Sequence, residues 1–189
     1  MEKKVVYFEK AGKENTFACL QIVKDAIRDF GYKYLVVAST SGDSGILFAE
    51  ALKGSGINLI VVTHCAGFKE PNSDEISAEA KQRIADAGAK VHTGTMITHS
   101  LETAFASKFN GLYPTLIVAQ ALRRFGEGAK VCCEMIMMAA DSGLVPEGEE
   151  ILAVAGTGRG SDTVLVIKSA ASKRFFDLKV LEVLAKPRG

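Results

Sequence analysis

The segment of residues 34–53 constrains the fold more than any other, because strand, turn and helix patterns follow one another in it without a break. Residues 34–38 are an apolar run rich in β-branched side chains, which is typical of a strand buried on both faces. Small hydroxyl residues and two glycines occupy residues 39–45, and a helical pattern then runs from Ile46 to Lys53. The segment therefore predicts one strand–turn–helix unit of an α/β fold.

The turn at residues 39–45 has the composition of an anion site. The first N–H groups of a helix have no partner inside the helix, and the positive end of the helix dipole points at the turn. The two glycines allow the backbone to approach a ligand closely, and the hydroxyl side chains add hydrogen-bond donors. A tight connection with a helix N-cap has a similar composition, so both interpretations stay open.

The alternation of strands and helices continues along the chain. Strand patterns are at residues 5–8, 58–62, 90–93, 151–155 and 163–167, and helical patterns are at residues 16–30, 77–87, 101–109, 114–125 and 129–142. This order predicts a single α/β domain over residues 1–189, with three α/β/α layers and a mostly parallel sheet. The short link at residues 156–162 predicts a C-terminal antiparallel hairpin, and the loosely alternating residues 175–184 suggest an edge strand.

In parallel sheets, ligands bind outside the carboxyl ends of the strands. That rule gathers four loops at one rim of the expected sheet, at residues 9–15, 39–45, 63–67 and 94–99. The hairpin link joins this rim if its first strand runs parallel to the others. Residues 63–73 form a longer loop than α/β connections usually have, which is typical of a lid or a binding loop.

Composition excludes several classes of function. The chain carries a formal net charge of +1 and 48% of its residues are hydrophobic, which favours a globular protein without a broad nucleic-acid surface. No apolar run is long enough to span a bilayer, so no membrane partner is expected. The N-terminus lacks the apolar core of a signal peptide, and the expected location is cytoplasmic. The four cysteines include no CxxC pair and are expected to be reduced thiols.

His64 and Cys65 lie at the expected rim as a possible catalytic pair. Neighbours in sequence usually point apart, so an ordinary loop pair is the preferred interpretation and the catalytic residues stay unknown. The spacing of the three histidines and Cys65 matches no standard zinc pattern, and no metal site is expected.

The helical pattern at residues 129–142 is apolar nearly all round, and its acids are Glu134 and Asp141. Such a helix is buried on most sides, either in the core or in a subunit contact. The two acids share one face, which is expected to meet solvent or the basic groups of a partner. A homo-oligomer is therefore expected, because one small domain has few ways to cover such a helix.

The order of these motifs resembles the C-terminal domain of pyruvate kinase. The resemblance runs from about residue 16 to residue 167, and it is carried by residues 36–44, 60–63, 129–156 and 156–167. In that domain a Ser/Thr–Gly turn holds a phosphate of an allosteric sugar bisphosphate. The catalytic barrel of the kinase alone needs roughly 250 residues, so pyruvate kinase activity is not expected.

Asp43 departs from the kinase pattern, because it places a carboxylate inside the proposed phosphate loop. Either this side chain points away as the helix N-cap, or the ligand is less anionic than a sugar bisphosphate. An added first strand and the long loop after residue 62 are also unlike the kinase domain. The chain is more similar to the stand-alone relatives of that domain, and this resemblance implies a site for flavin mononucleotide (FMN).

The expected FMN site draws on several of the rim loops. Candidates for holding the phosphate are Ser39, Thr40, Ser41, Gly42 and Ser44, and Asp43 is a further candidate residue of the cofactor site. Arg159 is a candidate charge partner for the phosphate or the flavin ring, and a solvated loop arginine is the alternative interpretation. Candidates for hydrogen bonds to the ribityl chain or the ring are Asn15, Thr63, Thr95 and Thr157.

Three hypotheses about function follow from these observations. The first is a small-molecule binding protein for a phosphorylated ligand, FMN above all, with any enzymatic or redox role left open. The second is a non-catalytic regulatory module that senses a phosphorylated metabolite. The third is an interaction protein in which the helix at residues 129–142 mediates assembly. Bound flavin would separate the first hypothesis from the other two.

Overall fold

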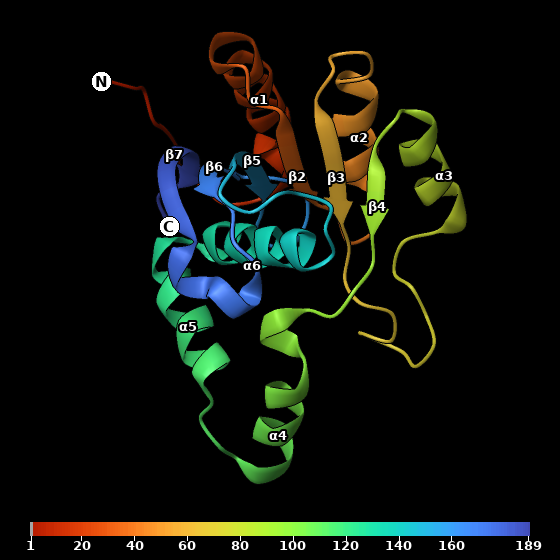
Figure 1. Cartoon of the computed structure of the whole chain (residues 1–189), viewed down its shortest axis with the longest axis vertical. Coiled ribbons are helices and arrows are strands. Elements are labelled where there is room, and N and C mark those ends of the chain that lie inside the picture. The colour runs from red at the N-terminus through yellow and green to blue at the C-terminus, as the bar shows by residue number, and fades with distance from the viewer. Residues whose placement is uncertain (1) are drawn as a thin grey trace.

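A computed structural model describes residues 2–189, and in them one sheet has seven strands in the order β1-β7-β6-β5-β2-β3-β4 (Figure 1). The strands are β1 (Val6–Phe8), β2 (Tyr34–Ala38), β3 (Asn58–Val62), β4 (Lys90–His92), β5 (Glu150–Ala155), β6 (Thr163–Lys168) and β7 (Lys179–Pro187). The helices are α1 (Thr16–Phe30), α2 (Asp43–Ala51), α3 (Ala78–Asp86), α4 (Leu101–Phe109), α5 (Pro114–Leu122) and α6 (Glu127–Asp141).

The sheet is mostly parallel, as the sequence predicts. Strands β5, β2, β3 and β4 pair in parallel, and β1 pairs in parallel with β7. Strand β6 pairs antiparallel with both β5 and β7, which confirms the C-terminal hairpin. The prediction of an edge strand in the tail is wrong, because β7 lies between β6 and the short strand β1.

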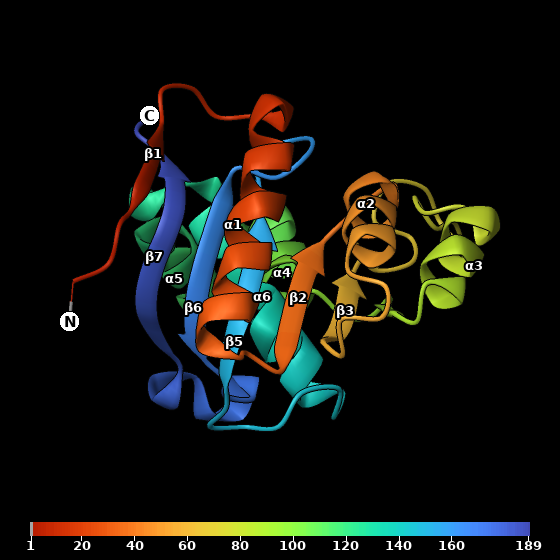
Figure 2. The ribbon, with the colours of Figure 1, turned by 90° about the horizontal axis from the view of Figure 1, so that it is seen from above.

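Helices cover both faces of the sheet (Figure 2). On one face, α1, α2 and α3 pack on side chains that include Leu35 and Val37 of β2. On the other face, α6 packs on a second cluster that includes Val36. Successive residues of a strand point to opposite faces, so β2 is buried on both sides and needs the continuous apolar run that its sequence has. The predicted three-layer α/β/α architecture is confirmed.

Helix α6 begins two residues before its predicted start and lies against the sheet. Cys132, Ile136 and Ala139 have no exposed surface, and they pack in the core between α6 and the strands. The protein's own sheet therefore covers the apolar surface of α6. Burial inside the domain already explains the composition of α6, so this helix gives no support for the expected homo-oligomer.

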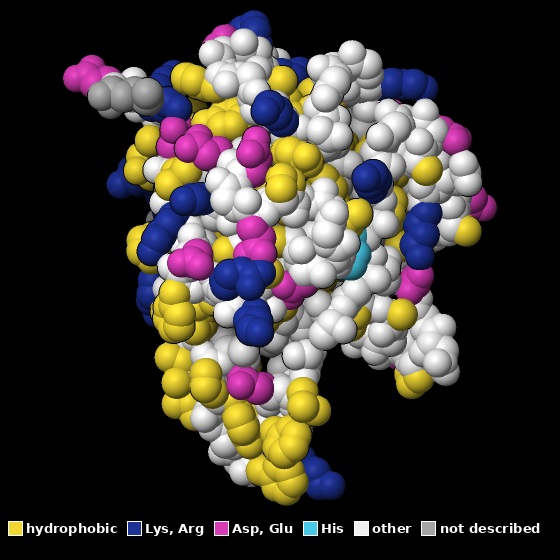
Figure 3. Space-filling model, viewed as in Figure 1, with side chains coloured by type: hydrophobic (Ala, Val, Ile, Leu, Met, Phe, Trp, Pro, Cys, Tyr) yellow, Lys and Arg dark blue, Asp and Glu magenta, His cyan; other side chains and the backbone are white. Residues whose placement is uncertain are grey.

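Helices α4 and α5 extend away from the sheet at the lower end of Figure 1. Hydrophobic side chains gather over them in Figure 3, where the exposed ones include Leu101, Phe105, Phe109, Leu112 and Ile117. The sequence predicts both helices, but it does not predict that they leave so much apolar surface exposed. No helix in residues 2–189 combines the length and the hydropathy that a membrane crossing needs.

The four cysteines are free thiols, and three of them are buried. Burial raises the pKa of Cys19 to about 12 and the pKa of Cys133 to about 11. These thiols stay protonated at neutral pH and therefore act as core side chains instead of nucleophiles.

Candidate functional site

A cavity of about 680 Å³ lies at the carboxyl ends of β2, β3 and β5. Its walls come from the ends of these strands, the turn before α2, the hairpin link after β5 and one side of α6. This is the place that the rule for parallel sheets predicts. Residues 9–15, which the same rule would place at this rim, do not line the cavity.

The turn between β2 and α2 has unpaired N–H groups beside the cavity. Gly42 is the N-cap of α2, with a φ of 100°, and the helix starts at Asp43, three residues earlier than predicted. Ser39 Oγ accepts a hydrogen bond from the N–H of Gly45 at 3.0 Å. Among the described residues, the N–H groups of residues 40–44 donate to no protein acceptor. A helix start with free N–H groups is suited to holding an anion.

Asp43 stands at this helix start as the first residue of α2. Its carboxylate is exposed and accepts a hydrogen bond from Ser41 Oγ at 3.0 Å. The N-cap role considered for Asp43 belongs to Gly42. The carboxylate still lines the cavity, so it weakens the attraction of the turn for a highly charged anion.

The charges around the cavity balance. Its lining includes the basic residues Lys69, Arg123, Lys130 and Arg159 and the acidic residues Asp43, Glu75, Glu127 and Glu134. Three of these basic side chains are paired: Lys69 with Glu75, Arg123 with Glu127 and Lys130 with Glu134. Arg159 is exposed on the hairpin link and has no ion pair in the described part of the chain. It is the basic side chain that is free to meet an anionic ligand.

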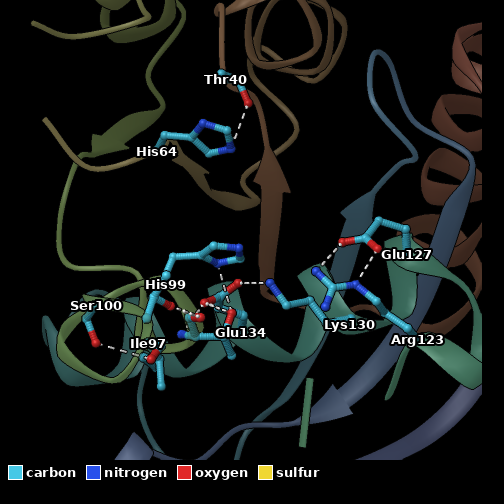
Figure 4. Close-up of polar contacts among 11 residues, drawn as sticks. Thr40, His64, Ile97, His99, Ser100, Arg123, Glu127, Lys130 and Glu134 are labelled. Carbon is cyan, nitrogen blue, oxygen red and sulfur yellow. Dashed lines mark hydrogen bonds and ion pairs between the residues drawn. The ribbon is translucent and has the colours of Figure 1, made fainter. Parts of the chain in front are cut away.

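A buried ion pair forms one wall of the cavity (Figure 4). Lys130 Nζ lies 2.6 Å from Glu134 Oε2, and the other carboxylate oxygen accepts hydrogen bonds from the N–H and the hydroxyl of Thr98. Burial raises the pKa of Glu134, but Lys130 and Thr98 outweigh it and hold this pKa below its usual range. The prediction that Glu134 shares a solvent-facing surface with Asp141 is wrong, because Glu134 is only 4% exposed.

His99 lies beside this ion pair, and its Nδ1 is 3.1 Å from Thr98 Oγ1. Burial lowers the pKa of His99, and the charge of Lys130 lowers it further. The imidazole is therefore neutral at pH 7 and can donate one hydrogen bond and accept another.

A second set of polar side chains in the cavity connects the turn after β2 with the long loop after β3 (Figure 4). Thr40 Oγ1 lies 3.3 Å from His64 Nε2, and His64 Nδ1 lies 2.6 Å from Glu75 Oε2. Burial raises the pKa of Glu75, but hydrogen bonds from Lys69 and His64 outweigh it and lower the pKa. Cys65 does not line the cavity, so His64 has Thr40 as its hydroxyl neighbour there instead of the adjacent thiol.

Comparison with known proteins shows which family this domain is related to. A model of the pyruvate kinase alpha/beta domain matches residues 18–167. The chain belongs to the pyruvate kinase alpha/beta domain family. Among solved structures, a pyruvate kinase from Cryptosporidium parvum has a TM-score of 0.44 and 14% identity, over 81% of this chain and 22% of that chain. An O-ureido-L-serine synthase has a TM-score of 0.33 and 18% identity, over 75% of this chain and 51% of that chain. The chain thus spans less than a quarter of the length of that kinase.

In this member of the pyruvate kinase alpha/beta domain family, the cavity brings together most of the predicted site residues. Those that line it are Ser39, Thr40, Ser41, Asp43, Ser44, Thr63 and Arg159. Gly42 contributes the backbone turn. The residues that do not line it are Asn15, Thr95 and Thr157. Asn15 instead donates its side-chain amide to the carbonyl groups of Lys10 and Gly12.

The hairpin link owes its shape to Asp162, which the sequence does not single out. Asp162 is fully buried, and its Oδ2 accepts hydrogen bonds from the N–H groups of Gly12 and Thr157, each at 3.0 Å. These bonds tie the link that carries Arg159 to the loop before α1. Asp162 therefore supports the site without contacting the cavity.

Proposed function

We propose that this domain binds a phosphorylated small molecule, with the phosphate at the turn between β2 and α2. The observation that carries the proposal is the run of free N–H groups at residues 40–44, four of which belong to residues that line the cavity. The hydroxyl group of Ser44 adds a donor, and Arg159 adds a free positive charge.

FMN is the ligand that we propose for this site. The balanced charge of the cavity favours a ligand with one phosphate and an uncharged body over a sugar bisphosphate. Apolar side chains for a flat ring are present in Val62, Phe68, Met96, Met135 and Met138. The volume of about 680 Å³ lies within the range of roughly 300–1,000 Å³ that is common for cofactor sites.

Different residues would bind different parts of FMN. The turn and Arg159 would hold the phosphate, while Lys130 and the neutral His99 would offer hydrogen bonds to polar ring atoms. FMN would supply electron-transfer chemistry when bound. The chain itself would bind, orient and partly exclude water from it.

Titration of the flavin-free protein with FMN and with riboflavin tests the phosphate site directly. Riboflavin lacks the phosphate but keeps the ring and the ribityl chain, so we expect FMN to bind at least about tenfold more tightly. Arg159→Ala should remove much of that difference, whereas Arg124→Ala should not, because Arg124 is exposed and does not line the cavity. Equal affinity for the two flavins would contradict the proposed phosphate site.

The regulatory module is the second candidate function. The same N–H groups at residues 40–44 would accept the phosphate of a sugar monophosphate as readily as that of FMN. Tight binding of sugar phosphates, with no binding of either flavin, would favour this candidate over the first.

A homo-oligomer stays a prediction, but the reason for it is now a different surface from the one that the sequence indicated. The exposed side chains of α4 and α5 now offer the apolar surface that α6 does not. Light scattering at micromolar concentration tests it, and a monomer would contradict the prediction.

A further inference from the structure

Thr40, His64 and Glu75 form a hydrogen-bonded chain in the wall of the cavity. The three groups come from the turn after β2 and from the long loop after β3, so the fold brings them together. A hydroxyl beside an imidazole that a carboxylate orients is the arrangement that activates a nucleophile in many hydrolases. The neighbouring N–H groups of residues 41–44 could stabilise developing negative charge.

Glu75 determines which nitrogen of His64 carries the hydrogen. Its lowered pKa makes Glu75 an ionised acceptor at neutral pH, so His64 Nδ1 must donate to it. In the neutral imidazole, Nε2 is then the acceptor, and the Thr40 hydroxyl donates to it. His64 is thereby placed to remove the proton of Thr40.

The position of Thr40 indicates which kind of substrate it would attack. Thr40 is the first residue of the run whose N–H groups form the proposed phosphate site, so a phosphate held there lies against its hydroxyl. The ring of Phe68 has its centroid 4.3 Å from that of His64 and shields the imidazole from solvent on one side. Phosphorus is therefore the electrophile that the turn presents to Thr40.

We propose that Thr40 is a catalytic nucleophile that cleaves phosphate monoesters, with His64 as its general base and Glu75 as a positioning residue. The proposal rests on the phosphate site described above. Thr40 Oγ1 forms a bond to phosphorus while the bond from phosphorus to the ester oxygen breaks. The hydroxyl proton passes to His64 Nε2, and the leaving oxygen, which lies in line on the opposite side of phosphorus, takes a proton from water and leaves a hydroxide.

Water completes the cycle. Its oxygen forms a bond to phosphorus while the bond to Thr40 Oγ1 breaks. His64 Nε2 returns its proton to Oγ1, and the attacking water gives a proton to the hydroxide from the first step. The net reaction converts a phosphate monoester and water into an alcohol and inorganic phosphate.

Hydrolysis of p-nitrophenyl phosphate by the full chain, in buffer with a metal chelator, tests the proposal. We expect Thr40→Val to lower kcat on the order of 10³-fold and His64→Gln to lower it about 10²- to 10⁴-fold. Thr40→Ser keeps a hydroxyl and should retain activity. Mass spectrometry of acid-quenched reactions should find phosphate on Thr40.

The role of Glu75 needs a readout that a loss of structure would not mimic. Glu75→Gln should lower kcat with little change in KM, and Glu75→Asp should restore part of the rate. Ser142→Ala and His92→Gln are matched controls, because they break a hydroxyl–imidazole contact of 3.2 Å outside the cavity. Neither control should change the rate.

Three results would overturn the inference: no turnover of p-nitrophenyl phosphate, unchanged turnover in Thr40→Val, or turnover of p-nitrophenyl acetate in preference to the phosphate. FMN is itself a phosphate monoester, so its binding is measured on Thr40→Val, which cannot cleave it, and this measurement distinguishes this failure from failure of the proposed function. A protein that binds FMN but cleaves no monoester keeps the proposed function and loses this inference. A protein that cleaves the monoester but binds no FMN keeps this inference and loses the proposal of FMN as the ligand.

Discussion

Lys130 Nζ and Glu134 Oε2 lie 2.6 Å apart across one turn of α6, and both side chains are almost fully buried in the wall of the cavity. Such a pair contributes little net stability, because removing two charges from water offsets their attraction. Removal of one partner is different, since the other charge then stays buried and unpaired. The pair is therefore sensitive to single substitutions.

Lys130→Met and Glu134→Gln each remove one half of this pair. We expect each variant to lose about 3–5 kcal/mol in the free energy of unfolding. The double variant should lose less than the sum of the two, because neither charge is then left alone. Urea denaturation of the wild type and the three variants measures this coupling.

The pair of Arg123 and Glu127 is the matched control, with the same i, i+4 spacing in sequence but with partly exposed side chains. Solvent screens this pair, so Glu127→Gln should lower the free energy of unfolding by about 1 kcal/mol or less. Similar losses at the two sites would contradict the importance that we assign to burial.

Glu147 should make part of the stability depend on pH. Hydrogen bonds from Arg174 and from the N–H of Ala171 lower the pKa of Glu147 from its ordinary value of 4.5 to about 2. A carboxyl group whose pKa is lower in the folded state stabilises that state above its unfolded pKa, and the contribution is lost as the pH falls through the folded value. Glu147→Gln should therefore cost most above pH 4.5 and progressively less toward pH 2. A difference that stays constant in denaturation curves across this range would contradict the prediction.

Gly42 should tolerate no side chain. Its φ is 100°, and a Cβ atom built there would lie 2.7 Å from the Cβ of Ala80. Gly54 has a φ of 79°, but its Cβ would meet nothing within 4 Å. Backbone strain should lower the free energy of unfolding of both alanine variants by about 1–2 kcal/mol. Crowding should lower that of Gly42→Ala by about 1–3 kcal/mol more. Thermal or urea denaturation gives both values, and equal losses would show that crowding at Gly42 is relieved.

Ser41→Asp places a second carboxylate in the proposed phosphate loop. Like charges about 4 Å apart repel by roughly 4 kcal/mol at an effective dielectric constant near 20, so FMN affinity should fall at least about tenfold. Ser55→Asp adds the same charge in the turn at the other end of α2 and should leave the affinity unchanged. An unchanged affinity in Ser41→Asp would place the phosphate elsewhere.

The sequence predicts the fold well because its signals are local. The apolar run at residues 34–38 and the short hairpin link each indicate their own structure. The place of β7 depends instead on pairing with β1, whose three residues lie far away along the chain. No local pattern indicates such a pairing, so the edge of the sheet was predicted wrongly.

The candidate site also was predicted where the sequence signal is local and missed where it depends on contacts between distant residues. Thr40 and Arg159 were found because they lie in loops at strand ends, and position alone indicates the rim. Glu75 lies in a long loop without periodicity, and its role appears only through its contact with His64. The i, i+4 spacing of Lys130 and Glu134 was an available signal of the buried pair.

The measurement that tests the central claim most directly is the visible absorbance spectrum of the freshly purified protein, repeated on the supernatant after denaturation. The side chains themselves absorb no visible light, so any flavin band reports a bound flavin. We predict a flavin spectrum or, for protein purified without flavin, stoichiometric uptake of added FMN that is released on unfolding. A colourless protein that takes up no added FMN would contradict the FMN site.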